Sequence, residues 1–398
     1  MEVQRKSAHG GCGVRVYPAP PDGPTCAPPE HSRPDYRVVM VVQHASASPC
    51  RTQNIRLPKP SRLSQRLTFQ AATPFTDAPW HNPPAMRAAR LPVTDATFAK
   101  LANKGTTRII TLSDGSESEL RIHTPLAPTG KPSPLIVLAF GGGFVAGENR
   151  QLSPYAGALA HLYGATVVNL DYRLAPEHAF PTAQNDAWDS LQWVAEHAAE
   201  LGADPAAGFI LGGVSAGGSL AATCAQRWAD EGKSPKLTGA WLSVPMIFDI
   251  SNVPAEYKDV YLAREQNAQA PVINDVAIGW VEKHLKPDFG SRQYSPFNSP
   301  NKETIHVGMP PSYFQIAGMD PLRDDGLIYE RVLRKAGVPT KLEVYPGVPH
   351  AHFSMVPTLK SSLRSNLDTV KGFAWLLKTQ EPTDQEAGAA LTAVPSSG

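Results

Sequence analysis

The fold is decided by the stretch Gly212-Gly213-Val214-Ser215-Ala216-Gly217-Gly218. It follows a short apolar run, Ala207 to Leu211, that is typical of a buried strand, and it precedes small, helix-compatible residues, Ser219 to Ala225. A strand, a Gly-x-Ser-x-Gly turn and a helix together form a nucleophile elbow. Glycine is required because the turn is too tight for side chains at those positions. The pattern therefore predicts that Ser215 lies above the strand ends, where the N–H groups of the next helix face it.

A single Gly-x-Ser-x-Gly match is weak, because an ordinary turn of small residues has the same composition. Two downstream residues strengthen it: Asp320 and His350 follow Ser215 in the order Ser, Asp, His that is used by α/β hydrolases. Upstream, Phe140-Gly141-Gly142-Gly143-Phe144 follows the apolar run Leu135 to Ala139. Together these features predict a nucleophile with a base, an orienting acid and backbone donors for an oxyanion.

Two further motifs point to a known family. They are Asp171-Tyr172-Arg173-Leu174-Ala175-Pro176-Glu177-His178-Ala179-Phe180-Pro181 and Asp320-Pro321-Leu322-Arg323-Asp324-Asp325. Taken with the glycine loop, the elbow and the histidine, they show that the chain from about residue 85 to 380 resembles the hormone-sensitive-lipase-like family of α/β-hydrolase carboxylesterases. The resemblance implies an α/β-hydrolase fold, with a mostly parallel eight-stranded sheet, helices on both faces and a helical cap.

The apolar pattern itself alternates between strands and helices, which predicts a mostly parallel sheet covered on both faces. A hairpin is expected over Thr106–Leu112 and Glu119–His123. Buried strands are expected over Leu135–Phe140, Thr166–Leu170, Gly208–Gly212, Leu237–Val244, Tyr313–Ala317 and Lys341–Tyr345. Helices are predicted around Ala187–Ala198, Val276–Leu285, Ile328–Ala336 and Leu359–Leu377.

We predict three parts along the chain. Residues 71–380 form the α/β-hydrolase domain, and its cap comes from 71–105, with one or two short helices, and from the insertion 246–309, where the alternation stops. Residues 1–70 contain ten prolines and are expected to be disordered. The alternatives for this extension are a transit peptide, if translation starts at Met40, and an inaccurate gene model. Residues 381–398 are polar and alanine-rich, and a disordered tail is expected there.

Composition limits the partners and the location of the protein. The net charge of +1 gives no field for nucleic acid, and no run of 18 apolar residues exists, so no transmembrane segment is expected. The four cysteines have neither a disulfide framework nor zinc spacing: Cys12, Cys26, Cys50 and Cys224. The expected location is cytoplasmic, or mitochondrial if translation starts at Met40. A homodimer is compatible with the sequence, which does not determine the oligomeric state.

Ester cleavage gives three residues distinct roles. Ser215 is the nucleophile, His350 is the base that takes its proton, and Asp320 orients the base. The alternative base is His352, two residues further on. The usual His-Gly-Phe of the family aligns with His350-Ala351-His352, which favours His350 and leaves a packing or pocket-wall role for His352. No metal and no cofactor are needed for this chemistry.

The backbone N–H groups of three residues are expected to bind the oxyanion: Gly142, Gly143 and Ala216. Gly141 is expected to shape the loop. The sequence departs from the family at Phe140, where a histidine usually opens the loop, and this puts the loop geometry in doubt. It departs again at Val214, where an acidic residue or threonine is common and could add a hydrogen bond beside the serine.

Other polar residues in these motifs are expected to be structural. Asp324 and Asp325 are alternatives to Asp320, and we assign them to the charge of a helix N-terminus. The long motif also contains four charged or polar residues, Tyr172, Arg173, Glu177 and His178. We expect them to form a structural network of polar contacts that ties a loop to the sheet.

The function predicted from these features is hydrolysis of carboxylic esters of small, uncharged substrates. A lyase or acyltransferase of specialised metabolism on the same fold is one alternative. A non-catalytic small-molecule receptor, as the gibberellin receptors are, is the other, and the presence of all three residues of the triad argues against it. The insertion carries five aromatic residues, and each is expected by default to pack the cap onto the body: Tyr257, Tyr261, Trp280, Tyr294 and Phe297. The pocket is expected to have apolar walls with few charges.

Overall fold

The computed structural model describes residues 78–127, 130–301 and 305–392. In this part of the chain, one sheet has eight strands in the order β1-β2-β4-β3-β5-β6-β7-β8. The strands are β1 (Thr106–Thr111), β2 (Glu117–His123), β3 (Leu135–Ala139), β4 (Thr166–Leu170), β5 (Phe209–Val214), β6 (Gly239–Ser243), β7 (Ser312–Ala317) and β8 (Thr340–Tyr345). The predicted α/β-hydrolase sheet is confirmed, with small shifts at the strand ends. The prediction of disorder for residues 1–70 lies outside the described residues.

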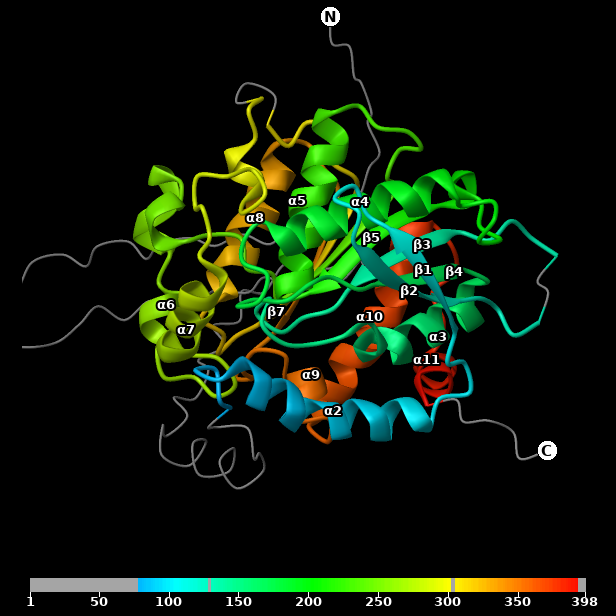
Figure 1. Cartoon of the computed structure of the whole chain (residues 1–398), viewed down its shortest axis with the longest axis horizontal. Coiled ribbons are helices and arrows are strands. Elements are labelled where there is room, and N and C mark those ends of the chain that lie inside the picture. Colours follow the sequence, from blue (N-terminus) through cyan, green and yellow to red (C-terminus); the bar gives the residue numbers. More distant parts are fainter. Residues whose placement is uncertain (1–77, 128–129, 302–304, 393–398) are drawn as a thin grey trace, which may run out of the picture. The chain divides into compact units, whose positions relative to one another are not determined.

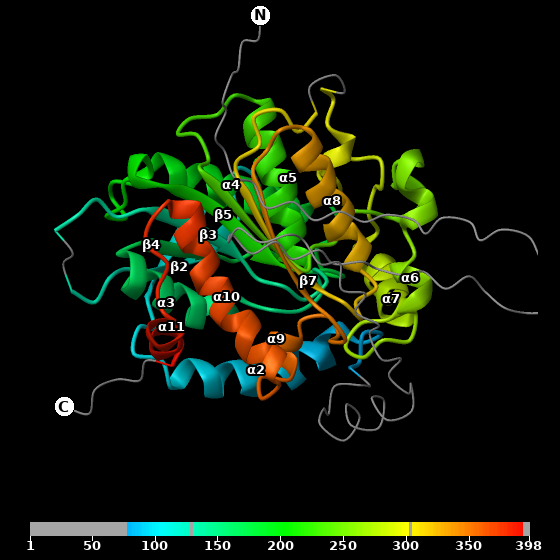
Figure 2. The same ribbon diagram turned by 180° about the vertical axis from the view of Figure 1, so that it is seen from behind.

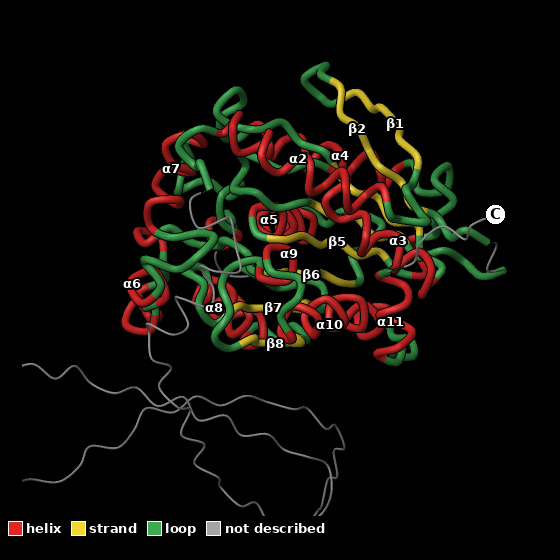
Figure 3. Tube along the Cα trace, turned by 90° about the horizontal axis from the view of Figure 1, so that it is seen from below, coloured by secondary structure: helices red, strands yellow, loops and turns green. Residues whose placement is uncertain are grey.

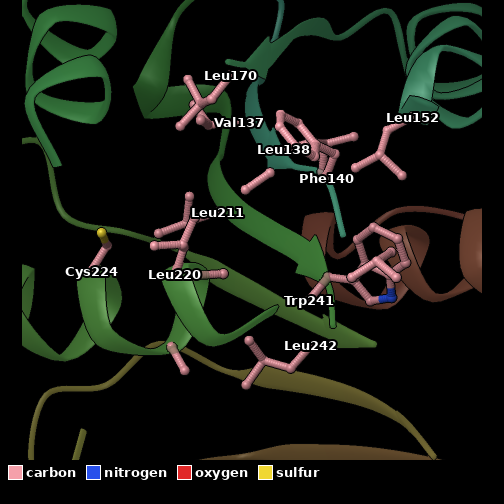
Figure 4. Close-up of a cluster of buried hydrophobic side chains, with 14 of the residues drawn as sticks. Val137, Leu138, Phe140, Leu152, Leu170, Leu211, Leu220, Cys224, Trp241 and Leu242 are labelled. Atoms are coloured by element: carbon pink, nitrogen blue, oxygen red, sulfur yellow. The ribbon is translucent and has the colours of Figure 1, made fainter. Parts of the chain in front are cut away.

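The sheet is mostly parallel. Strands β3 to β8 are parallel to one another, while β1 pairs with β2, and β2 with β4, in antiparallel register. Every residue of β3, β4, β5, β6 and β7 is buried, because helices cover both faces of the central sheet. Figure 4 shows part of this core, in which side chains from β3, β5 and β6 meet others from the neighbouring segments: Val137, Leu138, Leu211, Leu220 and Trp241.

Three helices pack together on one face of the sheet (Figure 2): α3 (Ser153–Tyr163), α10 (Lys360–Leu377) and α11 (Asp384–Leu391). The opposite face is covered by α4 (Thr182–Glu196), α5 (Ala216–Asp230) and α8 (Arg323–Lys335). Short helices lie in the connections: η1 (Asn149–Leu152), η2 (Pro205–Ala207) and α9 (His352–Met355). None of the helices in the described ranges combines the length and the apolar character needed to cross a membrane.

Two segments lie beyond the sheet and its covering helices (Figures 1 and 3). The first, the N-terminal segment, is residues 78–99 and contains one 17-residue helix, α2 (Pro83–Ala99), rather than short pieces. The second, the insertion, is residues 246–309 between β6 and β7. It contains η3 (Ile250–Asn252), η4 (Ala255–Val260), α6 (Ala263–Gln266), α7 (Asp275–Leu285) and η5 (Pro296–Asn298). The indole N–H of Trp80 donates to the carbonyl of Val272 at 3.2 Å, which joins the two segments.

Asp324 and Asp325 lie in the first turn of α8, as predicted, and their side chains also bind the insertion. Asp325 is fully buried and accepts hydrogen bonds from the N–H groups of Ile247 and Phe248, at 2.8 and 2.9 Å, and from the Tyr261 hydroxyl at 2.8 Å. Asp324 likewise accepts from two backbone N–H groups of the insertion. Both carboxylates therefore attach the insertion to α8, instead of serving only the dipole of their own helix.

Replacing Asp325 with alanine should lower the free energy of unfolding by about 3–5 kcal/mol. Burial raises the pKa of Asp325 to about 6, so the group is ionised at pH 7, and Nη2 of the buried Arg264 lies 3.9 Å from it. The variant leaves that cation without its counter-charge and two N–H groups without their acceptor. Denaturant unfolding at pH 7 measures the loss. Glu265→Ala, at an exposed position in the insertion, is the control and should change stability by less than about 0.5 kcal/mol. A loss below about 1 kcal/mol for Asp325→Ala would contradict an anchoring role.

The C-terminal residues also differ from the prediction, because part of the expected disordered tail is helix α11. Thr383 begins the helix with a capping box, in which its hydroxyl accepts from the N–H of Glu386 and the Glu386 side chain accepts from the N–H of Thr383. Ala387 and Ala390 are buried against the domain. The alanines that indicated a featureless tail are thus the packing face of a capped helix. The last six residues, 393–398, lie outside the described ranges.

Candidate active site

Ser215 lies on the turn between β5 and α5, as the elbow pattern predicts. Its φ of 56° and ψ of −118° are values that residues with a side chain rarely adopt. Its N–H donates to the carbonyl of Ser243 at 2.8 Å, which fixes the turn to the next strand. A Cβ on Gly217 would lie only 2.1 Å from the carbonyl oxygen of Ala139, so glycine is required for α5 to start this close to β3. The strained turn holds Ser215 at the carboxyl edge of the sheet.

His350 and Asp320 lie beside this serine. Asp320 follows β7 and His350 follows β8, so both leave the sheet at the same edge as Ser215. Nε2 of His350 is 2.9 Å from Oγ of Ser215, and Nδ1 is 2.7 Å from Oδ2 of Asp320. Asp320 is fully buried, and its Oδ1 accepts a hydrogen bond from the N–H of Leu322 at 2.8 Å. This arrangement lets a carboxylate hold the imidazole while its other nitrogen faces the serine hydroxyl.

His352, the alternative base, does not face the serine. Its ring packs against Tyr345 and Phe353, with centroid separations of 5.4 and 5.6 Å. Neither ring nitrogen has a hydrogen-bond partner among the described residues. Burial lowers the pKa of His352 to about 4, so this imidazole is neutral at pH 7. These contacts are those of a packing residue and favour His350 as the base.

The glycine loop after β3 reaches the same place. Gly142 and Gly143 have φ values of 146° and 63°, and the N–H groups of Val145 and Ala146 both donate to the carbonyl of Gly142. Within the described part of the chain, the N–H groups of Gly142, Gly143 and Ala216 are not used in any backbone hydrogen bond. They remain available to a negatively charged oxygen next to Ser215.

Phe140 holds this loop by other means than the histidine of the family. Its ring stacks on Tyr172, with centroids 4.0 Å apart and planes 8° apart. The Tyr172 hydroxyl donates to the carbonyl of Phe140 at 2.8 Å.

Nη1 of Arg90 would lie 2.9 Å from a Cβ on Gly142, and it has no hydrogen-bond partner among the described residues. The positive charge of Arg90 therefore lies next to the glycine loop, where it stabilises a negatively charged group.

The network expected for the long motif is present, and it also includes a residue of α2. Arg173 donates to both oxygens of the buried Asp186, at 2.9 and 2.6 Å. Glu177 forms an ion pair with Arg87 at 2.7 Å, and Nε of Arg87 donates to the carbonyl of Val145 at 2.8 Å. The network thus connects the N-terminal segment to the glycine loop. Sequence reasoning missed Arg87 and Arg90, because no motif marks the surface that α2 contacts.

Ser215 opens into a pocket of about 440 Å³, which includes some space open to solvent. Gly143 and Ala216 share its wall with Ser215. The remaining wall is largely apolar and includes residues of the N-terminal segment and the insertion, among them Trp80, Met246, Ile273, Ile278 and Val281. The five aromatic residues of the insertion are not in the wall; Tyr261, for example, donates to Asp325 of α8, in agreement with the packing role expected for it. The described residues contain no group of His, Cys, Asp or Glu side chains that could hold a metal ion.

Comparison with known proteins identifies relatives of this site and fold. Residues 136–354 match a family model described as the alpha/beta hydrolase fold. The chain is 36% identical to an AB hydrolase superfamily protein of Schizosaccharomyces pombe over 69% of this chain and 80% of that protein. It is 33% identical to the versiconal hemiacetal acetate esterase of Dothistroma septosporum, over 67% and 80%. Among solved structures, vibralactone cyclase superposes with a TM-score of 0.72 and 28% identity, covering 79% of this chain and 94% of that one. Other similar proteins are named esterase or carboxylesterase.

Proposed function

The chain belongs to the hormone-sensitive-lipase-like carboxylesterases of the α/β-hydrolase fold, and from this premise we propose that it hydrolyses esters of small substrates through an acyl-enzyme on Ser215. One observation carries the proposal. Oγ of Ser215, the imidazole of His350 and the carboxylate of Asp320 are joined by contacts of 2.9 and 2.7 Å. The free N–H groups beside the serine and the apolar pocket support it further.

In the proposed reaction, Oγ of Ser215 attacks the ester carbonyl carbon while Nε2 of His350 takes the serine proton. The carbonyl oxygen becomes negatively charged and is bound by the N–H groups of Gly142, Gly143 and Ala216. His350 then gives its proton to the leaving alcohol, and the acyl group remains on Ser215. A water molecule, deprotonated by His350, releases the acid and restores the serine. Asp320 keeps the proton of the imidazole on Nδ1 throughout.

We propose that the N-terminal segment and the insertion form the cap of the domain, with residues 71–105 and 246–309 as its limits. Both contribute to the pocket wall over Ser215, through Trp80 on one side and Ile273 and Val281 on the other. A wall built from two segments outside the sheet is suited to substrate selection, because it can vary without disturbing the sheet that positions the serine.

Activity should depend on acyl length and pass through a maximum at about four to eight carbons, since each buried methylene adds about 0.8 kcal/mol until the pocket is full. The apolar wall around Ser215 closes the pocket and limits the length of acyl chain that it can enclose. The measurement is kcat/KM for 4-nitrophenyl esters from acetate to palmitate. A maximum at the longest chains, with activation at a lipid–water interface, would instead identify a lipase.

The same series, run with Ser215→Ala as control, tests the proposed function as a whole. Absence of hydrolysis of every ester by folded, pure protein would contradict it. A second candidate is then favoured by the similarity to vibralactone cyclase, whose name describes ring formation. On the same site this would be intramolecular acyl transfer, in which a hydroxyl of the substrate replaces water. Mass spectrometry of the products of hydroxy esters distinguishes a lactone from a free hydroxy acid.

A further inference from the structure

The pocket beside Ser215 has one acidic residue in its wall, Glu282. Glu282 lies on α7, one turn after Ile278, and positions four apart lie on the same side of a helix. Ile278 and the neighbouring Val281 also line the pocket. The residues of α7 that line the pocket are therefore apolar except for Glu282.

The Glu282 carboxylate has no ion pair and no hydrogen bond to another side chain in the described ranges. Its charged neighbours are Asp249 and Arg264. Arg264 is already engaged, since it donates to the Tyr261 hydroxyl and to the carbonyl of Phe248, at 3.0 and 3.1 Å. Partial burial and the charge of Asp249 raise the pKa of Glu282, so its carboxylate is held without a full set of favourable partners. A half-buried acceptor of this kind gains most from a donor supplied by a ligand.

We propose that the natural ester carries a hydrogen-bond donor, an ammonium or a hydroxyl group, which binds Glu282 while the apolar part of the same substituent lies along Ile278 and Val281. This inference rests on the proposed ester hydrolysis and narrows its substrate class. In this arrangement the chain of the substituent lies against the apolar wall, and the donor at its end binds Glu282. Removing the charge of the Glu282 carboxylate should then reduce the stabilisation of the transition state far more for a donor-bearing ester than for an apolar ester.

The test compares three 4-nitrophenyl esters whose acyl chains have the same number of non-hydrogen atoms: heptanoate, 6-hydroxyhexanoate and 6-aminohexanoate. For each donor ester, kcat/KM is divided by the value for heptanoate, in the wild type and in Glu282→Gln. The donor loses its water in the pocket of the wild type and in that of the variant alike. Comparing the two ratios therefore removes this shared cost of desolvation. A hydrogen bond to a charged group predicts that the ratio falls about tenfold or more in Glu282→Gln for at least one donor. The donor with the larger fall is the natural one.

Glu265→Gln is the matched control, because it removes an exposed carboxylate of the same insertion outside the pocket. Its ratios should equal those of the wild type within about twofold. Ratios that stay within twofold in Glu282→Gln for both donors would overturn the proposal, as would an equal fall in Glu265→Gln.

A binding measurement separates this inference from the proposed reaction. n-Hexylammonium is titrated calorimetrically into full-length Ser215→Ala and into Ser215→Ala/Glu282→Gln. The dissociation constant should rise about tenfold in the double variant. If n-hexylammonium binding depends on the Glu282 carboxylate but no ester is hydrolysed, the proposed reaction is refuted. The proposed donor site at Glu282 then stands. If the wild type hydrolyses esters, but both variants bind n-hexylammonium equally and the ratios of kcat/KM are unchanged, the proposed reaction stands. The proposed donor site at Glu282 is then refuted.

Discussion

Ser215→Ala is expected to lower kcat for ester hydrolysis by about 10⁵- to 10⁶-fold, because the acyl-enzyme can no longer form. His350→Ala should cause a loss of the same order, since the nucleophile and its base act as a unit. Rates with the preferred 4-nitrophenyl ester measure both. Thermal unfolding of Ser215→Ala should match the wild type, because the only side-chain hydrogen bond of the hydroxyl within the described residues is the one to His350. A Ser215→Ala enzyme with more than about 1% of the wild-type rate would refute the assignment of the nucleophile.

His352→Ala is the control for the choice of histidine. The ring is buried against Tyr345 and Phe353, so its removal leaves a cavity and should destabilise the fold by about 1–3 kcal/mol. At a temperature where the variant is folded, its kcat should stay within about tenfold of the wild type. An inactive, folded His352→Ala combined with an active His350→Ala would reverse the assignment.

The parallel sheet was predictable because its signals are local. Buried parallel strands are continuous apolar runs, and the elbow requires glycine on both sides of Ser215 for steric reasons that hold in any context. Asp320 and His350 could be placed because each directly follows a strand, and the carboxyl ends of parallel strands meet at one edge. The distances of 2.7 and 2.9 Å agree with that placement.

The contacts of the N-terminal segment and the insertion were not predictable, because they join segments that are far apart in the chain. No local pattern indicates that Asp325 binds the N–H groups of Ile247 and Phe248, which lie almost 80 residues earlier. The same holds for Trp80, in the segment before α2, and Glu282, on α7, which line one pocket. Helix α11 is a different case. Its capping box is readable at Thr383 and Glu386, but the prediction of a tail used only the polar, alanine-rich composition.

Asp320→Asn isolates the role of the carboxylate from the shape of the site. Asparagine has the same shape, and its amide oxygen can still accept the hydrogen bond that Leu322 donates to Oδ1 at 2.8 Å. Its NH₂ group then faces Nδ1 of His350, where Oδ2 of Asp320 now lies at 2.7 Å. An NH₂ group donates to the imidazole, so the ring must carry its proton on Nε2, the nitrogen that faces Ser215. That tautomer cannot take the serine proton.

We therefore expect kcat of Asp320→Asn to fall about 10⁴-fold, with KM changed far less, because the pocket that binds the substrate is untouched. Circular dichroism and thermal unfolding verify that the fold is retained. Asp320→Glu provides a second variant that keeps the charge but displaces it, and it should retain more activity than Asp320→Asn if charge and tautomer are what matter. A loss below about tenfold in Asp320→Asn would mean that the buried carboxylate is structural, and that His350 selects its tautomer without Asp320.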